Sequence, residues 1–111
     1  MTKFMVIYNA GASAGDMMSS ATPEEMKAGL DAWMAWSAEA GDALLDFGMP
    51  VQARSRITAN GATDPATEAS GYSMLEAASL DELTALLEKH PHLKTPDSSI
   101  DVLEVLPMPG M

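Results

Sequence analysis

Two histidines, His90 and His92, flank Pro91 and are the only imidazole side chains in the chain. Imidazole gains and loses a proton near neutral pH, so the pair is a candidate for acid–base catalysis. Proline keeps the residue before it out of the helical region, which can bring both rings to one side of the chain. The alternative is structural: a favourable charge at the C-terminal end of a helix, followed by an exposed turn residue. Without an obvious third ligand, the pair does not predict a metal site.

Two glutamates, Glu76 and Glu104, interrupt segments that otherwise alternate apolar residues. A carboxyl group inside an apolar cavity has a raised pKa and can act as a general base. These glutamates are therefore further catalytic candidates. The alternative is a partly solvated face on which each glutamate pairs with a cation such as Lys3, Arg54 or Arg56.

Arg54 and Arg56 lie two residues apart in the alternating segment 51–58, so a strand places both on one face. Two guanidinium groups side by side can bind a carboxylate or phenolate ligand through paired hydrogen bonds. The alternative is a solvated edge ribbon whose charges protect it against edge-to-edge aggregation.

Aromatic residues provide candidate walls for a pocket: Trp33, Trp36 and Tyr72. Helical spacing places Trp33 on an apolar stripe, which predicts a core position, and Trp36 on the flank of that stripe. We therefore expect Trp36, rather than Trp33, to reach a cleft or a partner chain. The ten methionines indicate adaptable apolar packing, in the core or around a loose pocket.

The composition excludes several classes of function. The chain of 111 residues predicts a single domain, residues 1–111, and its net charge of −10 disfavours binding to nucleic acid or to an anionic membrane. The absence of cysteine excludes disulfides, zinc–thiolate sites and thiol catalysis. The apolar run Phe4–Tyr8 is too short for the core of a signal peptide, so a cytoplasmic location is expected.

Local patterns predict an α+β domain. Thr22, Pro23 and Glu25 mark a helix start with a capping box, and Gly41 marks the end of that helix. A second capping box begins at Ser79. Segment 9–21 is expected to be a loop, segment 60–70 is expected to be polar and irregular, and Asn60-Gly61 predicts a turn. The predicted elements are strands over 4–8, 43–47, 51–58, 71–77 and 100–106, with helices over 23–40 and 80–89.

This order reads β-α-β, a hairpin extension, then β-α-β, which predicts a ferredoxin-like βαββαβ domain with an antiparallel sheet. Right-handed crossovers place both helices on one face of the sheet. The other face then carries uncovered apolar side chains, and a bare apolar sheet face indicates an interface or a ligand cleft. We therefore predict a homodimer.

Several segments in register resemble the YCII-related family. They cover nearly the whole chain: Lys3–Tyr8, Gly41–Gly48 after a tryptophan-containing helix, Gly71–Glu82 and Val102–Pro107. The resemblance implies a small ferredoxin-like domain that pairs into a dimeric α/β barrel.

The chain departs from that family at its functional motifs. Many relatives carry D-G-P-F before the Gly-Tyr strand, where this chain has the sequence Asp-Pro-Ala-Thr-Glu at 64–68. Other relatives carry a histidine on the first helix and an aspartate nearby, proposed as an acid–base pair. A dehydrochlorinase branch of the family is similar in this respect. This first helix has no histidine, so that acid–base pair cannot be transferred.

Three functions from different classes follow. The first is a dimer that binds a small organic molecule and works without a cofactor, as an isomerase or lyase acting by proton transfer. The second is a non-catalytic ligand-binding or interaction module, and the third is oxygenase-like chemistry, which rests on barrel analogy alone. Catalysis predicts that one of the four titratable candidates points into a closed cleft beside a second polar group. A binding module predicts an apolar pocket without such groups.

Overall fold

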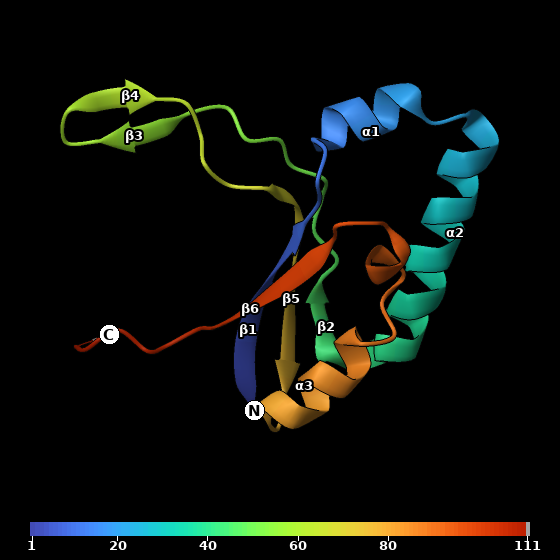
Figure 1. Cartoon of the computed structure of the whole chain (residues 1–111). Coiled ribbons are helices and arrows are strands. Elements are labelled where there is room, and N and C mark those ends of the chain that lie inside the picture. The colour runs from blue at the N-terminus through green and yellow to red at the C-terminus, as the bar shows by residue number, and fades with distance from the viewer. Residues whose placement is uncertain (111) are drawn as a thin grey trace.

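The computed structural model describes residues 1–110 as an antiparallel four-stranded sheet with helices on one face (Figure 1). The strand order β2-β5-β1-β6, with α2 after β1 and α3 after β5, is the ferredoxin-like βαββαβ topology. The predicted fold class is confirmed. The elements of this unit are β1 (Thr2–Asn9), α2 (Pro23–Ala40), β2 (Leu44–Asp46), β5 (Ala69–Ala77), α3 (Leu80–Leu87) and β6 (Ser99–Glu104).

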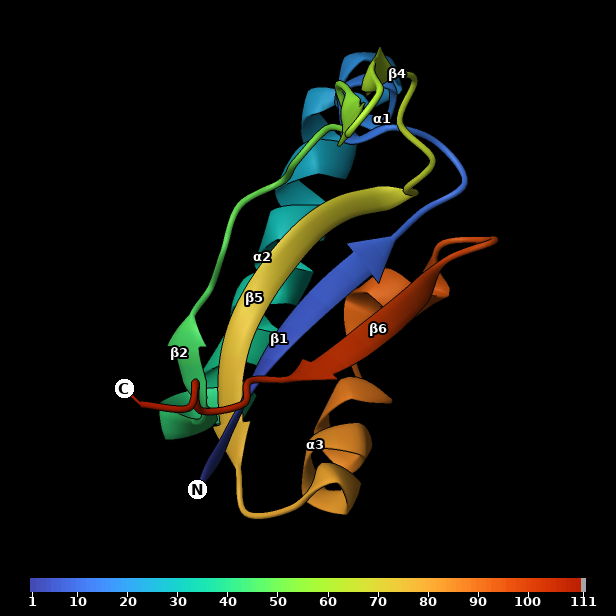
Figure 2. The ribbon, with the colours of Figure 1, turned by 90° about the vertical axis from the view of Figure 1, so that its left-hand side faces the viewer.

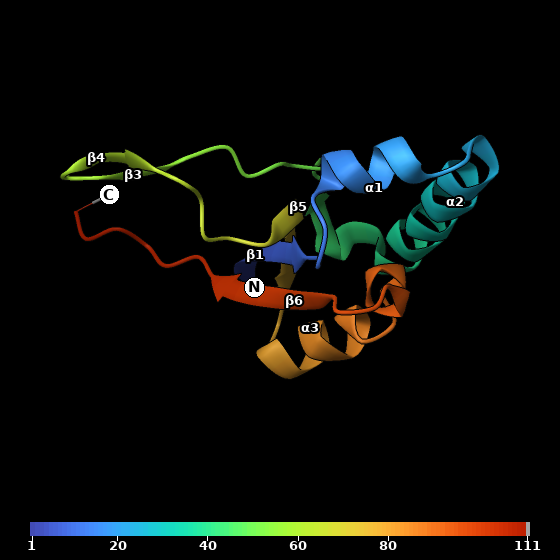
Figure 3. The same cartoon turned by 45° about the horizontal axis from the view of Figure 1, so that its top comes forward.

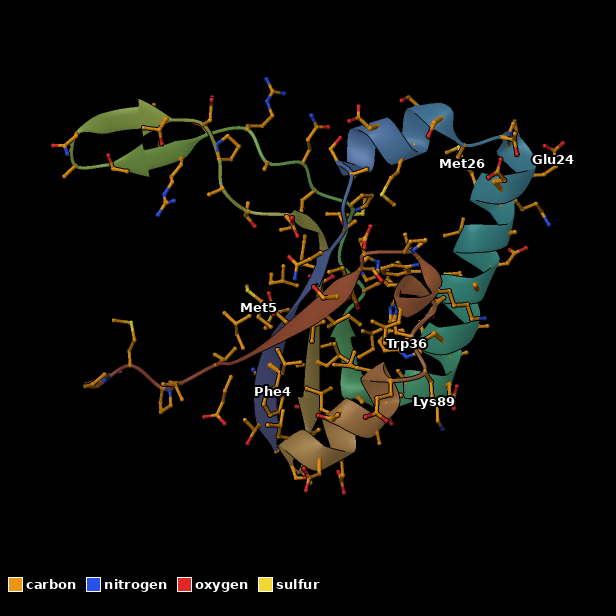
Figure 4. All side chains as sticks on the ribbon, in the orientation of Figure 1. Phe4, Met5, Glu24, Met26, Trp36 and Lys89 are labelled. Carbon is orange, nitrogen blue, oxygen red and sulfur yellow. The ribbon has the colours of Figure 1, made fainter. Side chains whose placement is uncertain are left out.

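The apolar run near the N-terminus forms the central strand. β1 pairs with β5 on one side and with β6 on the other, so its backbone is bonded along both edges. Phe4, Val6 and Tyr8 point toward the helices and are buried in the core. Met5 alternates with them and points to the opposite face (Figure 4). The core therefore lies between the sheet and the helices.

Helix α2 begins and ends where its capping residues predict. The Thr22 side chain accepts a hydrogen bond from the Glu25 backbone N–H, and the Glu25 carboxylate accepts one from the Thr22 N–H. These bonds satisfy two backbone donors that a helix start leaves open. The helix stops at Gly41, whose φ of 57° lies in a region that L side chains rarely adopt.

The predicted apolar stripe of α2 is only partly buried, and the expectation that Trp33 rather than Trp36 forms the core is wrong. Trp36 is 3% exposed, and its Nε1–H donates a 3.1 Å hydrogen bond to the Leu86 carbonyl. Met26 and Leu30 are exposed, and Trp33 is half-buried. The buried residues of α2, Trp36 and Ala40, lie in its last turns, so only that end packs into the core (Figure 4).

The turn after α3 places both histidines inside the molecule. Ser79 caps α3 by accepting from the Glu82 N–H, and the helix ends at Leu87, two residues before the predicted end. His90 is extended, as its position before Pro91 predicts, and a 3-10 turn follows (η2, Pro91–Lys94). Both rings are buried. The alternative of an exposed turn residue is therefore wrong.

Two segments differ from their predicted structure. Residues 14–20 form a helix (α1, Ala14–Ser20) inside the expected loop, because the Ser13 hydroxyl accepts from the Asp16 N–H and starts it. Of the predicted strand 51–58 only the last three residues are regular: β3 (Arg56–Thr58) pairs with β4 (Gly61–Thr63) across the predicted Asn60-Gly61 turn. Segment 60–70 is therefore not irregular throughout. A short 3-10 turn (η1, Gly41–Ala43) precedes β2.

The second face of the sheet has no helix over it (Figure 2). Met5, Leu103 and Val105 are exposed there or at its end. The β3–β4 hairpin and the C-terminal segment both leave the domain on this side, away from α2 (Figure 3). Among residues 1–110, no helix is both long enough and apolar enough to cross a membrane.

The two tryptophans should differ in their contribution to stability. Trp36→Phe removes a buried hydrogen bond and leaves a void, so the free energy of unfolding should fall by about 2 kcal/mol. Trp33→Phe should cost less than about 1 kcal/mol, because part of the ring is already solvated. Urea unfolding followed by circular dichroism measures both values, and equal costs would contradict the assigned packing.

Candidate functional site

A cleft of about 630 Å³ lies between α1, the N-terminal half of α2, segment 47–50, the start of β5 and η2. Its volume is in the range of sites for small organic ligands. Five of the lining residues are aromatic: Tyr8, Trp33, Phe47, Tyr72 and His92. The cleft exists because α1 and the first half of α2 extend past the core, so that they enclose it together with β5, segment 47–50 and η2.

Methionines and glycine shape the cleft walls. Met17, Met26 and Met49 come from α1, α2 and segment 47–50, and their flexible side chains can adapt to a ligand. Gly48 has φ of 78°, and a side chain there would collide with the Tyr72 carbonyl. Glycine therefore lets segment 47–50 pass directly against β5, which closes one wall.

The cleft differs in charge from the rest of the molecule. The chain holds 16 acidic residues, yet no Asp or Glu from the described part of the chain lines the cleft. Lys94, exposed on η2, is the one lysine or arginine among the lining residues that the structure describes. The cleft therefore favours a neutral or anionic ligand over a cation.

His92 lines the cleft, and one of its two ring nitrogens has no hydrogen-bond partner. Its Nε2 lies 2.7 Å from the Asn9 backbone oxygen, and since a carbonyl can only accept, Nε2 carries the proton. The Nδ1 atom of a neutral His92 is then an unprotonated acceptor. His90 Nε2 is the single buried side-chain nitrogen or oxygen atom without a hydrogen-bond partner in residues 1–110. His92 Nδ1 has no partner either. Since it is not among the buried atoms without a partner, it is accessible, and His92 is one of the residues that line the cleft.

His90 lies behind His92 and does not line the cleft. Its Nδ1 accepts a 3.0 Å hydrogen bond from the His92 backbone N–H, so a neutral His90 carries its proton on Nε2. The ring is 2% exposed and packs against Trp33 and Trp36, with both centroid separations at 4.3 Å. These contacts hold the turn that positions His92.

The surroundings of His90 keep it neutral. Burial, with a smaller contribution from the charge of His92, lowers the pKa of His90 from 6.5 to about 4. Protonation of Nδ1 would also remove the acceptor for the His92 N–H. At neutral pH, His90 is therefore a neutral positioning residue rather than an acid.

Tyr8 contributes its ring to the cleft while its hydroxyl is engaged elsewhere. The Tyr8 O–H donates to Ser73 Oγ at 2.9 Å, and Ser73 donates in turn to the Phe47 carbonyl at 2.7 Å. Burial raises the pKa of Tyr8, although the Ser73 hydrogen bond opposes this shift. The phenol proton is therefore held in the core. Sequence reasoning treated Tyr8 only as a strand residue and missed its place in the cleft.

The remaining candidates are separated. Tyr72 is among the lining residues, although its pairing with Ile7 places its side chain on the open face of the sheet. Glu76 lies opposite Lys3 on the open face of the sheet, whereas Glu104 lies opposite Phe4, at the exposed end of the helix-covered face. The two carboxylates therefore lie on opposite faces of the sheet, and neither lines the cleft.

Three ligand-binding candidates also lie away from the cleft. Arg54 and Arg56 are exposed on the projecting hairpin and the segment that leads to it. Trp36 is in the core, so the expectation that it reaches the cleft is wrong, and Trp33 occupies that position. Within residues 1–110, no group of three or more histidine, aspartate or glutamate side chains could hold a metal ion.

Comparison with known proteins shows similarity in structure but not in sequence. The sequence matches no family model and no curated protein. A solved structure with a similar fold is 5-chloro-2-hydroxyhydroquinone dehydrochlorinase from Burkholderia phenoliruptrix AC1100, in complex with 2,5-dihydroxybenzoquinone. The match covers 91% of each chain with a TM-score of 0.49 and 16% sequence identity. Similarity at this level carries no information on the activity of the present chain.

The low pKa of His90 predicts a pH-dependent stability. In the unfolded chain His90 takes up a proton near pH 6.5, but in the folded chain only near pH 4. Its contribution to stability is complete above 6.5 and is lost as the pH falls toward 4. Thermal melting at intervals across this window measures the loss.

His90→Asn is the matched variant, because its side-chain oxygen can still accept from the His92 N–H but does not titrate. We expect a lower melting temperature at pH 7, owing to lost ring packing, and a flatter pH dependence between 6.5 and 4. An unchanged slope would assign the pH dependence to other groups.

Proposed function

We propose that the cleft binds a small, flat, largely apolar organic molecule with an acidic hydroxyl or C–H group. His92 Nδ1 accepts the proton from this group, as the base of a cofactor-free proton transfer of the isomerase or lyase type. The observation that carries the proposal is the arrangement of His92: one ring nitrogen is bonded to the Asn9 carbonyl, the other has no hydrogen-bond partner, and the residue lines the cleft.

The proton transfer is balanced within the cleft. The O–H or C–H bond of the ligand breaks, its electron pair stays on the ligand, and the proton forms a bond with His92 Nδ1. The Asn9 carbonyl accepts from Nε2–H and so stabilises the positive imidazolium. Lys94 at the rim and the lack of carboxylates among the described lining residues favour the anion that forms.

A non-catalytic ligand-binding module is the second candidate function, and one observation favours it. His92 is a single free base, while the hydroxyl of Tyr8, which also lines the cleft, is engaged with Ser73. An isomerase that returns the proton to the same ligand needs only one such group, whereas a lyase that protonates a leaving group needs an acid as well. Ligand ionisation without turnover would therefore indicate binding alone.

We also propose a homodimer in which two open sheet faces pack together, the dimeric α/β barrel arrangement that the family resemblance implies. Met5 and Leu103 are exposed on this face, next to Ile7 and Met74, which are only half-buried. A face with these side chains is more apolar than a solvated sheet requires. A second copy offers the same face and would cover it symmetrically.

Binding of 4-nitrophenol tests the role of His92, because the phenolate and the phenol differ in visible absorption. We expect the wild type to bind it as phenolate and to quench the fluorescence of Trp33. His92→Gln keeps an N–H donor toward Asn9 but removes the base, so the bound probe should stay protonated. The affinity should fall by about tenfold or more, as for the loss of one charge-assisted hydrogen bond.

4-Nitroanisole, which has no acidic proton, is the control ligand. It should bind the wild type and the His92→Gln variant equally. If the variant still binds 4-nitrophenol as phenolate with unchanged affinity, His92 is not the proton acceptor. If neither compound binds the wild type, the cleft is not a site for this class of ligand.

Leu103→Glu tests the homodimer. A carboxylate in an apolar interface loses its hydration, so we expect dissociation to monomers at micromolar concentration, measured by sedimentation velocity. Leu80→Glu is the matched control, since Leu80 is similarly exposed but starts α3, where a carboxylate is favourable. A monomeric wild type, or a Leu103→Glu variant as dimeric as the control, would contradict the proposed interface.

A further inference from the structure

Residues 51–63, which we name the basic arm, leave the domain as an extended segment and end in the β3–β4 hairpin (Figure 1). Every residue from 54 to 63 is exposed, and Ile57 at 75% is among the most exposed large apolar side chains of the described residues. The hairpin has two strands of three residues each. A two-stranded hairpin of this size is at best marginally stable in water. The basic arm therefore needs a second surface that stabilises it by contact.

The charge of the basic arm indicates what that surface is. It holds Arg54 and Arg56 and no carboxylate, whereas the rest of the chain holds four basic residues and all 16 acidic ones. Neither arginine is in an ion pair within residues 1–110, where the salt bridges are Lys27–Asp31 and Lys89–Glu39. A basic projection on an acidic domain is complementary in charge to a second copy of the same chain.

The direction of the basic arm agrees with this partner. It projects on the side of the sheet that has no helix, and the C-terminal segment leaves on the same side (Figure 1, Figure 3). Two copies that pack their open sheet faces together therefore bring each arm alongside the other copy. The arm and the open face would form one continuous contact surface.

The basic arm is rooted in the cleft wall. Met49 and Pro50 line the cleft just before the arm begins, and Ser70 lines it just after the chain returns. The Val51 N–H donates a 2.9 Å hydrogen bond to the Ser70 carbonyl, which joins the start of the arm to β5, the strand to which the chain returns. A change in the position of the arm therefore affects Met49, Pro50 and Ser70, which line the cleft.

We propose that the basic arm of each protomer docks on the acidic surface of a second copy, through Arg54 and Arg56, and that docking orders the cleft wall at its root. This inference rests on the proposed homodimer and extends it, because it makes the ligand affinity of one protomer depend on its partner. The arm carries specificity through charge, while the open sheet face supplies the apolar area.

Reversal of the two arginine charges tests the docking. The double variant Arg54→Glu/Arg56→Glu should fold normally, since both side chains are exposed, and circular dichroism verifies this. At low salt its dimer dissociation constant, from sedimentation equilibrium, should exceed that of the wild type by about tenfold or more. Added salt should weaken the wild-type dimer and bring the two constants closer together.

Two matched variants separate docking from net charge. Lys27→Glu/Lys89→Glu changes the net charge by the same amount at exposed positions outside the basic arm, and should weaken the dimer much less. Arg54→Lys/Arg56→Lys keeps the charge and should dimerise like the wild type. If the arginine and lysine reversals weaken the dimer equally, the docking is refuted.

The cleft coupling has its own readout. At a protein concentration where the wild type is dimeric and the reversal variant is not, the variant should bind 4-nitroanisole more weakly, although it retains every lining residue. Equal affinity would refute the coupling. A reversal variant that dimerises as tightly as the wild type refutes the docking alone and leaves both the open-face dimer and the ligand site standing. If Leu103→Glu dissociates the dimer and the arginine reversal does not, the conclusion is the same: the docking is refuted and the open-face dimer stands.

Discussion

The 2.7 Å hydrogen bond between His92 Nε2 and the Asn9 carbonyl ties the turn after α3 to the end of the central strand. It joins residues 83 positions apart, and it decides which nitrogen of a neutral His92 carries the proton. The bond depends on the neighbouring packing, because His90 accepts the His92 backbone N–H while its own ring is held between Trp33 and Trp36. A network of this kind has few alternative arrangements, because His90 Nδ1 and His92 Nε2 each have a single hydrogen-bond partner.

The overhang of α2 gives the cleft its shape. The end of the helix is anchored in the core by Trp36, and its first half, with α1, extends over the end of β1 and the start of β5. Met26 and Leu30 lie on the apolar stripe of α2 but beyond the end of the core. They therefore line the cleft instead of packing in the core. A hydrophobic stripe that is longer than the core therefore leaves an apolar cleft.

Charge is distributed unequally over the molecule. The chain has 16 acidic residues against six basic ones. The described lining of the cleft nevertheless holds no carboxylate, and the basic arm holds none either. An acidic exterior repels polyanions, whereas the carboxylate-free cleft can accept a small anion. The same contrast makes a second copy of the chain an electrostatically suitable partner for the arm.

The sequence by itself determined the elements whose signals are local. The capping box at Thr22 and Glu25, the stop at Gly41 and the extended His90 before Pro91 depend on neighbours within four residues, so their structure could be inferred before any tertiary contact was known. The order of these elements, with the right-handed crossover rule, was enough for the ferredoxin-like topology. The one missed helix, α1, has seven residues and two methionines among small polar neighbours, too short for a recognisable period.

Only the tertiary structure decided the site. The helical period places Trp33 and Trp36 close together on α2, but which of them is buried depends on how far along α2 the sheet extends. The alternation of strands places Glu76 and Glu104 on defined sides of their own strands, yet the register of each with β1 puts them on opposite faces. Tyr8 and His92 meet only because β1 and η2 converge in space. Contacts between distant segments arise from the packing of whole elements, and no local pattern encodes that packing.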